Sequence, residues 1–487
     1  MIDRNPREVW KWFEAISEIP RASGNEKAVS DFVVEFARER GLPVWQDKLN
    51  NVIIHKKASS GFEDKPTVIL QGHLDMVPEK SKNSTHDFSK DPIELIVEGD
   101  FLHANHTTLG GDDGIAIAMM LAILDDNSLK HPRLECVMTT SEETGMDGVL
   151  GLTDEHLSGK YLINIDSEEE GIFLTSSAGG IHITNTFGKF GAMLSLTEDR
   201  SSYKAILIKV SGLTGGHSGM EIVKQRGNAI KILGRLLYKM QNRNIMLLAN
   251  LSGGSKHNAI PLEAEVVAIT TKEKYMKENI EVLERERELV LDEIRTTDPD
   301  AKIEFEKVEV PKEDMGYYST DRIIKFLYLV PNGVIEFSRD IPGLVQTSAN
   351  VAIIQNCENT YKILTSVRGS KKSSMDDFVQ HIAELTSILE TKRMETSDGY
   401  PAWEYEKDSK LRDIACEVYE SLTGKKPVLT AIHAGLECGI LKKLLPETEM
   451  ISMGPNMYDV HTEKERIDIP SAERFWEYLK KLLEKIE

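Results

Sequence analysis

The chain has 487 residues, of which 40% are hydrophobic and 28% are charged; this composition is typical of a globular protein, and the length favours two domains over one. The formal net charge is −20, from 59 Lys+Arg against 79 Asp+Glu, which argues against nucleic acid or an anionic membrane as a partner. No apolar run of the sequence approaches the ~20 residues of a membrane helix, and the N-terminus lacks the apolar stretch of a secretory signal.

The cysteines give an expectation about location. Cys136, Cys357, Cys416 and Cys438 are scattered and have no CxxC spacing. Scattered thiols are typical of a reducing compartment rather than of a disulfide framework. We therefore expect a cytoplasmic protein with free cysteines.

The first part of the chain alternates between predicted helices and predicted strands. Apolar residues recur at helical spacing in residues 7–19 and 25–41, and the apolar segment 114–126 is also a predicted helix. Strand-like runs occupy residues 51–57, 66–77, 134–143 and 160–169. This alternation is the pattern of an α/β domain with a largely buried sheet.

The middle of the chain has a different pattern. Two passages in which strands alternate with helices suggest an α+β module, and their similarity hints at a duplication that is too faint in the sequence to identify as a repeat. Residues 408–487 return to the α/β pattern and end in a predicted helix. We therefore predict an α/β domain, with a mixed and mostly parallel sheet flanked by helices, at residues 1–180 and 394–487. An α+β domain is inserted at residues 181–393.

Acidic and histidine residues cluster after predicted strands of the α/β part. The clusters are GHLD (72–75), LGGDDG (109–114), TSEETG (140–145), NIDSEEE (164–170) and DVHTEKE (459–465). In open α/β sheets, ligands bind outside the carboxyl ends of the strands, so groups far apart in sequence can converge there. Mixed imidazole and carboxylate donors suit Zn²⁺ or Mn²⁺, and the lack of nearby thiolates disfavours a structural zinc site.

Each cluster by itself also has a purely structural explanation. His73 and Asp75 could be a hydrogen-bonded pair at a strand end, and GGDDG could supply a helix N-cap. SEETG and NIDSEEE could be solvated acidic turns. Independent turns would not be expected to present His, Asp, Glu-Glu, Asp and a late His in this order within one domain, which favours a shared site.

This ordered set of motifs resembles a known superfamily. GHLDMVP, GGDDGIAIAMMLAIL, TTSEETGMDG and LINIDSEEEG are similar to the core motifs of the di-metal peptidases that include aminoacylases, glutamate carboxypeptidases, tripeptidases and dipeptidases. LTGGHSGMEI, HNAIP and IHAGLECG resemble the branch of aminoacyl-histidine dipeptidases, also called Xaa-His or cytosolic non-specific dipeptidases. The resemblance covers almost the whole chain and implies that the inserted domain is a lid, which grips substrate and could support a homodimer.

The resemblance also implies a set of metal ligands for two divalent ions, with Zn²⁺ favoured and Mn²⁺ or Co²⁺ as alternatives. Asp112 would bridge both ions, with Asp113 as the alternative for that role. The remaining ligands would be His73 and Asp166 for one ion, and Glu143 and His461 for the other. Glu142 would be the general base, and Asp75 would orient His73.

Substrate-binding residues are implied in the inserted domain and in the IHAGLECG loop. Arg368 suits a substrate carboxylate because its guanidinium can bond bidentately, although the sequence alone also allows it to be a surface residue. His217 could assist the reacting carbonyl or be a polar residue of a glycine-rich loop, and His433 could be a loop residue without a substrate role. The full set of predicted substrate-binding residues is His217, Asn258, Arg368, Gly435 and Glu437.

The predicted function is therefore hydrolysis of a small peptide substrate, namely a dipeptide with a free N-terminus. Xaa-His dipeptides are included, and β-alanyl-histidine is a candidate. The alternatives are a tripeptidase, an aminoacylase or a carboxypeptidase-like amidohydrolase of the same superfamily. A non-catalytic binding protein on this scaffold is disfavoured, because Glu142 and all five ligand positions are present.

Overall fold

The computed structural model describes residues 2–189, 202–241, 246–312, 317–397 and 399–486. Contacts between residues divide the chain into two compact units. The first unit comprises Met1–Ser177, Trp403–Ala431 and Leu436–Glu487. The second, called the insert unit below, comprises Ala178–Ala402 and Ile432–Gly435. Within the described residues, no helix is long and apolar enough to cross a membrane.

The insert unit extends beyond the residues 181–393 expected for it. Strand β17 (Arg393–Thr396) pairs with β9 (Gly179–Gly188), and Tyr400 forms a bridge with Gly180. The segment Ile432–Gly435 joins this unit because the amide of Ala178 donates to the carbonyl oxygens of Ile432 and Ala434. These contacts link residues far apart in sequence, so local sequence patterns do not show them.

The first unit is built on a mixed sheet, as expected. Strands β6, β3, β7 and β19 at its centre run parallel, whereas β1, β2 and β8 pair antiparallel with their neighbours. All six residues of β3 are buried, which agrees with its continuous apolar run. The strand order is β1 (Val44–Gln46), β2 (Val52–Lys56), β6 (Leu134–Thr139), β3 (Val68–His73), β7 (Tyr161–Asn164), β19 (Glu449–Ser452), β8 (Ile172–Ser177) and β18 (Val428–Ile432).

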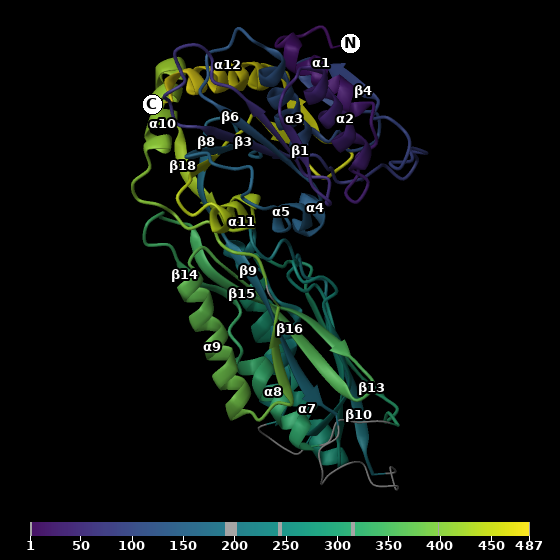
Figure 1. Ribbon diagram of the computed structural model, residues 1–487. Helices are drawn as coiled ribbons and strands as arrows, with labels where there is room; N and C mark the ends of the chain where they lie inside the picture. Colours follow the sequence, from purple (N-terminus) through teal and green to yellow (C-terminus); the bar gives the residue numbers. More distant parts are fainter. Residues whose placement is uncertain (1, 190–201, 242–245, 313–316, 398, 487) are drawn as a thin grey trace. The chain divides into compact units, whose positions relative to one another are not determined.

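Helices pack on this sheet and on one another. Helix α3 (Gly111–Asp125) is buried all round because its sequence is apolar on every face, and it contacts α1 (Arg7–Ser17) and β3. Helices α10 (Lys410–Thr423) and α12 (Ile469–Lys485) lie side by side (Figure 1). The other elements of this unit are α2 (Lys27–Glu39), α4 (Glu142–Gly145), α5 (Asp147–Leu150), α11 (Glu437–Leu444) and a small sheet of β20 (Met457–Tyr458), β21 (Arg466–Asp468), β5 (Phe101–Ala104) and β4 (Leu95–Glu98).

The insert unit is one antiparallel sheet with helices packed on it through a shared hydrophobic core (Figure 1). Its strands follow the order β13 (Lys302–Val308), β10 (Lys204–Ser211), β12 (Ala264–Thr270), β11 (Met246–Gly253), β15 (Val345–Asn356), β16 (Thr360–Gly369), β9 and β17, with β14 (Gly333–Phe337) beside β15. Its helices are α6 (Ala229–Gln241), α7 (Glu273–Ile294), α8 (Tyr317–Leu329), α9 (Lys372–Ile388) and the 3-10 helix η1 (Ile222–Lys224).

This sheet consists of two halves with the same topology. The first half runs β10, α6, β11, β12, α7, β13, and the second runs β9, α8, β15, β16, α9, β17, with β14 as an addition. In both halves the spatial order of the strands is fourth, first, third, second, and every pairing is antiparallel. The halves meet where Gly253 of β11 pairs with Ile354 of β15. The duplication suggested by the sequence is thus present in the topology.

Candidate metal centre

The predicted metal ligands follow neighbouring strands of the first unit. His73 ends β3, Glu143 lies in α4 just after β6, and Asp166 comes soon after β7. Since β6, β3 and β7 are adjacent and parallel, their carboxyl ends lie at the same edge of the sheet. Asp112 lies in the first turn of α3, and His461 lies in the loop between β20 and β21.

The carboxylate of Asp112 lies between the two histidines. Its Oδ1 is 3.0 Å from Nε2 of His73, and its Oδ2 is 3.1 Å from Nε2 of His461. Each oxygen of one carboxylate therefore faces a different imidazole. This is the geometry that a carboxylate bridging two ions requires.

The other two predicted ligands divide between these histidines. Oδ1 of Asp166 is 3.7 Å from Nε2 of His73, and Oε2 of Glu143 is 3.0 Å from Nε2 of His461. The carboxylates of Asp112 and Glu143 raise the pKa of His461 to about 11. An environment that favours the cationic form of an imidazole so strongly also favours a bound cation, and imidazole and carboxylate donors without a thiolate suit Zn²⁺, Mn²⁺ or Co²⁺.

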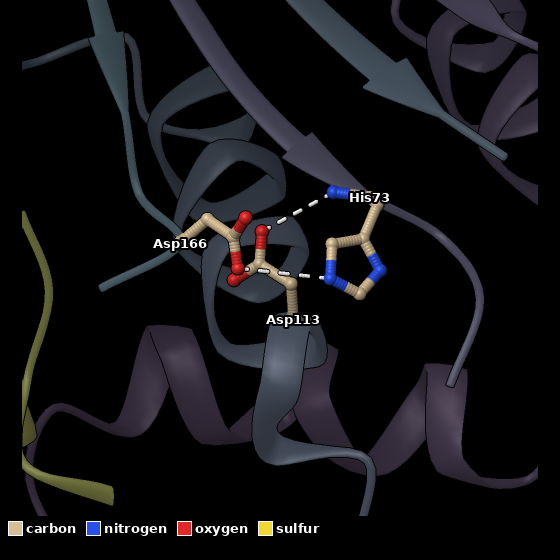
Figure 2. Close-up of side chains that lie close together, drawn as sticks. All are labelled: His73, Asp113 and Asp166. Atoms are coloured by element: carbon tan, nitrogen blue, oxygen red, sulfur yellow. Dashed lines mark hydrogen bonds and ion pairs between the residues drawn. The ribbon is translucent and has the colours of Figure 1, made fainter. Parts of the chain in front are cut away.

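Asp113 has a different position from Asp112, to which it is joined by a cis peptide bond. It is fully buried, and its Oδ2 accepts a hydrogen bond from the backbone amide of His73 at 3.2 Å (Figure 2). Burial away from water raises the pKa of its carboxyl well above the ordinary value. Together with His73 and Asp166, Asp113 forms a group compact enough to hold an ion, but of the two aspartates it is Asp112 that lies beside both histidines.

Asp75 contacts both His73 and the segment that carries the two glutamates. Its Oδ1 lies 3.4 Å from Nδ1 of His73, and its carboxylate accepts hydrogen bonds from the backbone amides of Glu142 at 3.1 Å and Glu143 at 3.3 Å. The hydroxyl of Ser23 also donates to it, at 2.7 Å. The sequence predicted only the contact with His73.

Glu142, His73 and Glu143 each offer one potential ligand atom, and these atoms lie close enough together to hold a metal ion. Burial raises the pKa of its carboxyl well above the ordinary value, and the nearby carboxylates of Asp166 and Glu437 add to the effect. A raised pKa makes a carboxylate a stronger base toward a proton.

The backbone at two of these positions is strained. His461 and Ser141 have φ angles of 63° and 56°, in the left-handed region that non-glycine residues rarely adopt. Ser141 directly precedes Glu142, and its amide and hydroxyl both donate to the buried carboxylate of Glu26 at 3.2 Å. Strain of this kind persists where surrounding contacts hold the backbone in place. At Ser141, the two hydrogen bonds to Glu26 are such contacts.

Arg21, Glu26 and Glu465 are buried charged residues that the sequence analysis did not select. Each hydrogen-bonds to a loop that bears a predicted ligand or the predicted base. Glu465 lies within the DVHTEKE motif, so its proximity to His461 in sequence was the available signal. For Arg21 and Glu26 the sequence carries no comparable signal.

Glu437 belongs to the first unit and is fully buried. Its carboxylate accepts hydrogen bonds from the hydroxyl of Thr139 at 2.6 Å and from the side-chain amide of Gln71. Burial raises its pKa to about 7. Oε1 has no hydrogen-bond partner among the described residues, and a substrate role for this residue stays a prediction.

The insert unit holds the other predicted substrate-binding residues. His217 and Asn258 lie on two loops that are hydrogen-bonded to each other. The backbone amide of Ser218 donates to the carbonyl oxygen of Asn258 at 2.8 Å. Nδ1 of His217 accepts from the amides of Gly219 at 3.3 Å and Met220 at 3.1 Å, so the proton of the neutral ring is on Nε2. Burial, reinforced by the charge of Arg368, lowers the pKa of His217 to about 4.

Arg368 is buried, with 8% of its surface exposed, so it is not a surface residue. Its guanidinium donates to the hydroxyl of Tyr400 at 2.6 Å, and its Nε has no hydrogen-bond partner within the described part of the chain. Nε2 of His433 lies 2.7 Å from the hydroxyl of Ser348. Gly435 ends the short segment Ile432–Gly435 that belongs to this unit.

Comparison with known proteins identifies the family of this chain. Residues 69–485 match Peptidase family M20/M25/M40. The chain is 35% identical to the cytosol non-specific dipeptidase of Escherichia coli, over 99% of this chain and 98% of that protein. It is 34% identical to aminoacylhistidine dipeptidase from Vibrio alginolyticus, whose crystal structure aligns with a TM-score of 0.90 over 100% of this chain and 98% of that one.

A more distant relative shares the fold alone. The crystal structure of a tripeptidase from Staphylococcus aureus is 15% identical and aligns with a TM-score of 0.57 over 99% of both chains. The expected similarity to aminoacyl-histidine dipeptidases is confirmed by the two nearer relatives, and the expected fold class is confirmed by the alignment with the Vibrio structure. The chain therefore belongs to Peptidase family M20/M25/M40.

Proposed function

We propose that this chain hydrolyses the peptide bond of dipeptides with a free N-terminus, including Xaa-His dipeptides, with β-alanyl-histidine as a candidate substrate. The observation that carries the proposal is the carboxylate of Asp112 between His73 and His461, with Glu142 in the same cluster. The names of the two relatives that match nearly the whole chain support the substrate class.

Five side chains would hold two divalent cations: His73, Asp112 and Asp166 on one side, and Asp112, Glu143 and His461 on the other. We propose Zn²⁺ as the native ion, with Mn²⁺ and Co²⁺ as alternatives, because imidazole and carboxylate donors accept all three. When bound, such ions polarise the scissile carbonyl and acidify a water molecule. Asp75 would keep the ring of His73 in the orientation that presents Nε2 to this side.

Glu142 would act as the general base. Its carboxylate would take a proton from the attacking water and return it to the leaving amine, as general acid–base catalysis of peptide hydrolysis requires. The hydrogen bonds from the backbone amides of Glu142 and Glu143 to Asp75 would hold the backbone that carries Glu142 in place during both proton transfers. Glu143 would remain a ligand throughout.

The insert unit would supply groups that bind substrate. A neutral His217 with its proton on Nε2 can donate a hydrogen bond to a carbonyl oxygen that gains negative charge. Arg368, held by Tyr400 and with Nε available, would bind the C-terminal carboxylate of the dipeptide. Asn258, Gly435 and Glu437 would line the remainder of the substrate site.

A substrate panel tests this proposal. The purified protein, loaded in turn with Zn²⁺, Mn²⁺ or Co²⁺, would be assayed against free dipeptides, the same dipeptides with an acetylated N-terminus, tripeptides and N-acyl amino acids. We expect cleavage of the free dipeptides and its loss on chelation. Preferential cleavage of tripeptides or of N-acyl amino acids would overturn the assignment in favour of those activities.

We also propose a cytosolic location and a homodimer. The name of the Escherichia coli relative and the four free cysteines support the location. The homodimer rests on the family resemblance alone. Sedimentation velocity at micromolar concentration tests it, and a monomer would count against it.

A further inference from the structure

Four consecutive backbone amides converge on the side chain of Glu465. The amides of Leu109 and Gly110 donate to its Oε2 at 2.8 and 3.0 Å. The amides of Gly111 and Asp112 donate to its Oε1 at 2.7 and 3.2 Å. Glu465 is 2% exposed, and a carboxylate removed from water is costly unless its lone pairs are satisfied in this way.

The loop of residues 109–112 is shaped to fit this carboxylate. Gly110 has a φ of 69°, a conformation that a side chain would strain. A Cβ added at Gly111 would lie 2.9 Å from Cγ1 of Ile467 and 3.2 Å from Oε1 of Glu465. The loop therefore approaches Glu465 more closely than residues with side chains would allow.

Arg21 holds the same loop from another side. Its guanidinium donates to the carbonyl oxygen of Gly110 and to those of Leu74 and Asp75, the latter two at 3.0 and 3.1 Å. The loop is thus tied through Arg21 to the strand end that bears His73. Through Glu465 it is tied to the segment that bears His461, four residues earlier in the sequence.

We propose that Glu465 is a positioning residue of the metal centre: its carboxylate fixes the backbone of Leu109–Asp112 so that Asp112 presents one oxygen to His73 and the other to His461. The carboxylate of Asp112 tolerates little rotation. A rotation that brings one oxygen closer to His73 moves the other oxygen away from His461. The inference rests on the proposed function in so far as the centre binds the ions of a metallopeptidase.

The test compares two variants of the full chain, Glu465→Gln and Glu463→Gln. Glutamine keeps the size of Glu465 but presents an NH₂ group to two of the four amides and removes the charge. Glu463 is exposed on the same segment, so Glu463→Gln is the matched control. Affinity for Zn²⁺ would be measured by competition with a chromophoric chelator, and the geometry of the centre by the visible spectrum of the Co²⁺-loaded protein.

We expect Glu465→Gln to bind Zn²⁺ about 10–100-fold more weakly, the range found when groups that hold metal ligands are removed, and to change the Co²⁺ spectrum. Its kcat should fall at limiting metal and recover at excess metal, while KM stays the same. Glu463→Gln should match the wild type in each measurement. An unchanged Zn²⁺ affinity and Co²⁺ spectrum in Glu465→Gln would overturn the inference.

Two further readouts keep the test decisive. If Glu465→Gln does not fold, hydrogen exchange of the wild type answers the question, since the four amides should exchange slowly; fast exchange in the folded protein would refute the inference. If the wild type binds two ions but cleaves no dipeptide, the proposed function fails, while the metal affinities of the variants still decide the role of Glu465.

Discussion

At the scale of single residues, two neighbours in sequence make different contacts in the candidate centre. Glu142 and Glu143 are adjacent in sequence. The carboxylate of Glu143 contacts His461, whereas that of Glu142 lies near His73. Ser141, with a φ of 56°, directly precedes the pair, and the backbone amides of both glutamates donate to Asp75. This separation allows one carboxylate to bind metal and the other to move a proton.

Replacing Glu142 with glutamine should abolish proton transfer and leave metal binding intact. We expect kcat on a dipeptide to fall about 10²–10⁴-fold, the range for a general acid–base group. Steady-state kinetics together with metal analysis of the same preparation check this. A Glu142→Gln variant with full activity would sink the proposed mechanism.

The pair Asp112→Asn and Asp113→Asn tests which aspartate bridges. Asp112 lies beside both histidines, whereas Asp113 accepts from the backbone amide of His73. Asp112→Asn should therefore lower the bound metal from two ions per chain, while Asp113→Asn should keep both ions. Elemental analysis after gel filtration gives the stoichiometry, and the reverse result would assign the bridge to Asp113.

The buried His433 should make the insert unit sensitive to acid. Burial, reinforced by the charge of Arg368, lowers its pKa to about 4, against about 6.5 in the unfolded chain. Between these pH values the unfolded chain binds the proton and the folded chain does not, so stability decreases as pH falls through this window. The loss reaches about 3 kcal/mol once the pH lies below both values.

Urea unfolding of the wild type and of His433→Asn at a series of pH values measures this effect. The difference in unfolding free energy between the two proteins should be constant above about pH 6.5 and should change steadily down to about pH 4. A difference that does not vary with pH would show that His433 does not titrate as its surroundings indicate.

At the scale of secondary-structure elements, the same local rules that the sequence obeys explain most of the fold. β3 was recognisable because both of its faces are apolar, and α3 because it is apolar all round. β17 was not predicted as a strand, because it is short and mostly exposed and carries no strong periodicity. Its place depends on pairing with β9, more than two hundred residues earlier.

Lys231 of α6 illustrates how one element stabilises another in the insert unit. Its ammonium donates to the carbonyl oxygens of Leu327, Tyr328 and Val330, which lie at the C-terminal end of α8, where carbonyl groups lack partners within the helix. Lys231→Met should destabilise the insert unit by about 2 kcal/mol. Chemical unfolding checks this against Lys239→Met in the last turn of the same helix, which should have little effect.

At the scale of the whole molecule, the predicted site residues fall in both compact units. All five predicted metal ligands belong to the first unit, and His217, Asn258 and Arg368 belong to the insert unit. Within the insert unit, His217 and Asn258 lie in the first half of the sheet, and Arg368 lies on β16 of the second half.

Metal removal should therefore affect the two units differently. An ion that binds only the folded first unit adds about 2.7 kcal/mol to its stability at a concentration of 100 Kd. We expect Zn²⁺ to raise the thermal transition of the first unit and to leave that of the insert unit unchanged. Differential scanning calorimetry with and without chelator measures this, and an equal shift of both transitions would contradict it.

The sequence by itself determined the fold class, the presence of an inserted domain and the five clusters of potential ligands, because strand periodicity and residue chemistry are local properties. Only the tertiary structure decided which oxygen of Asp112 faces which histidine, and that Glu465 and Arg21 hold the loop between them. These facts depend on contacts such as that between Gly111 and Glu465, which are 354 residues apart. No local pattern specifies such a pairing, because it arises only when the sheet brings its strand ends to one edge.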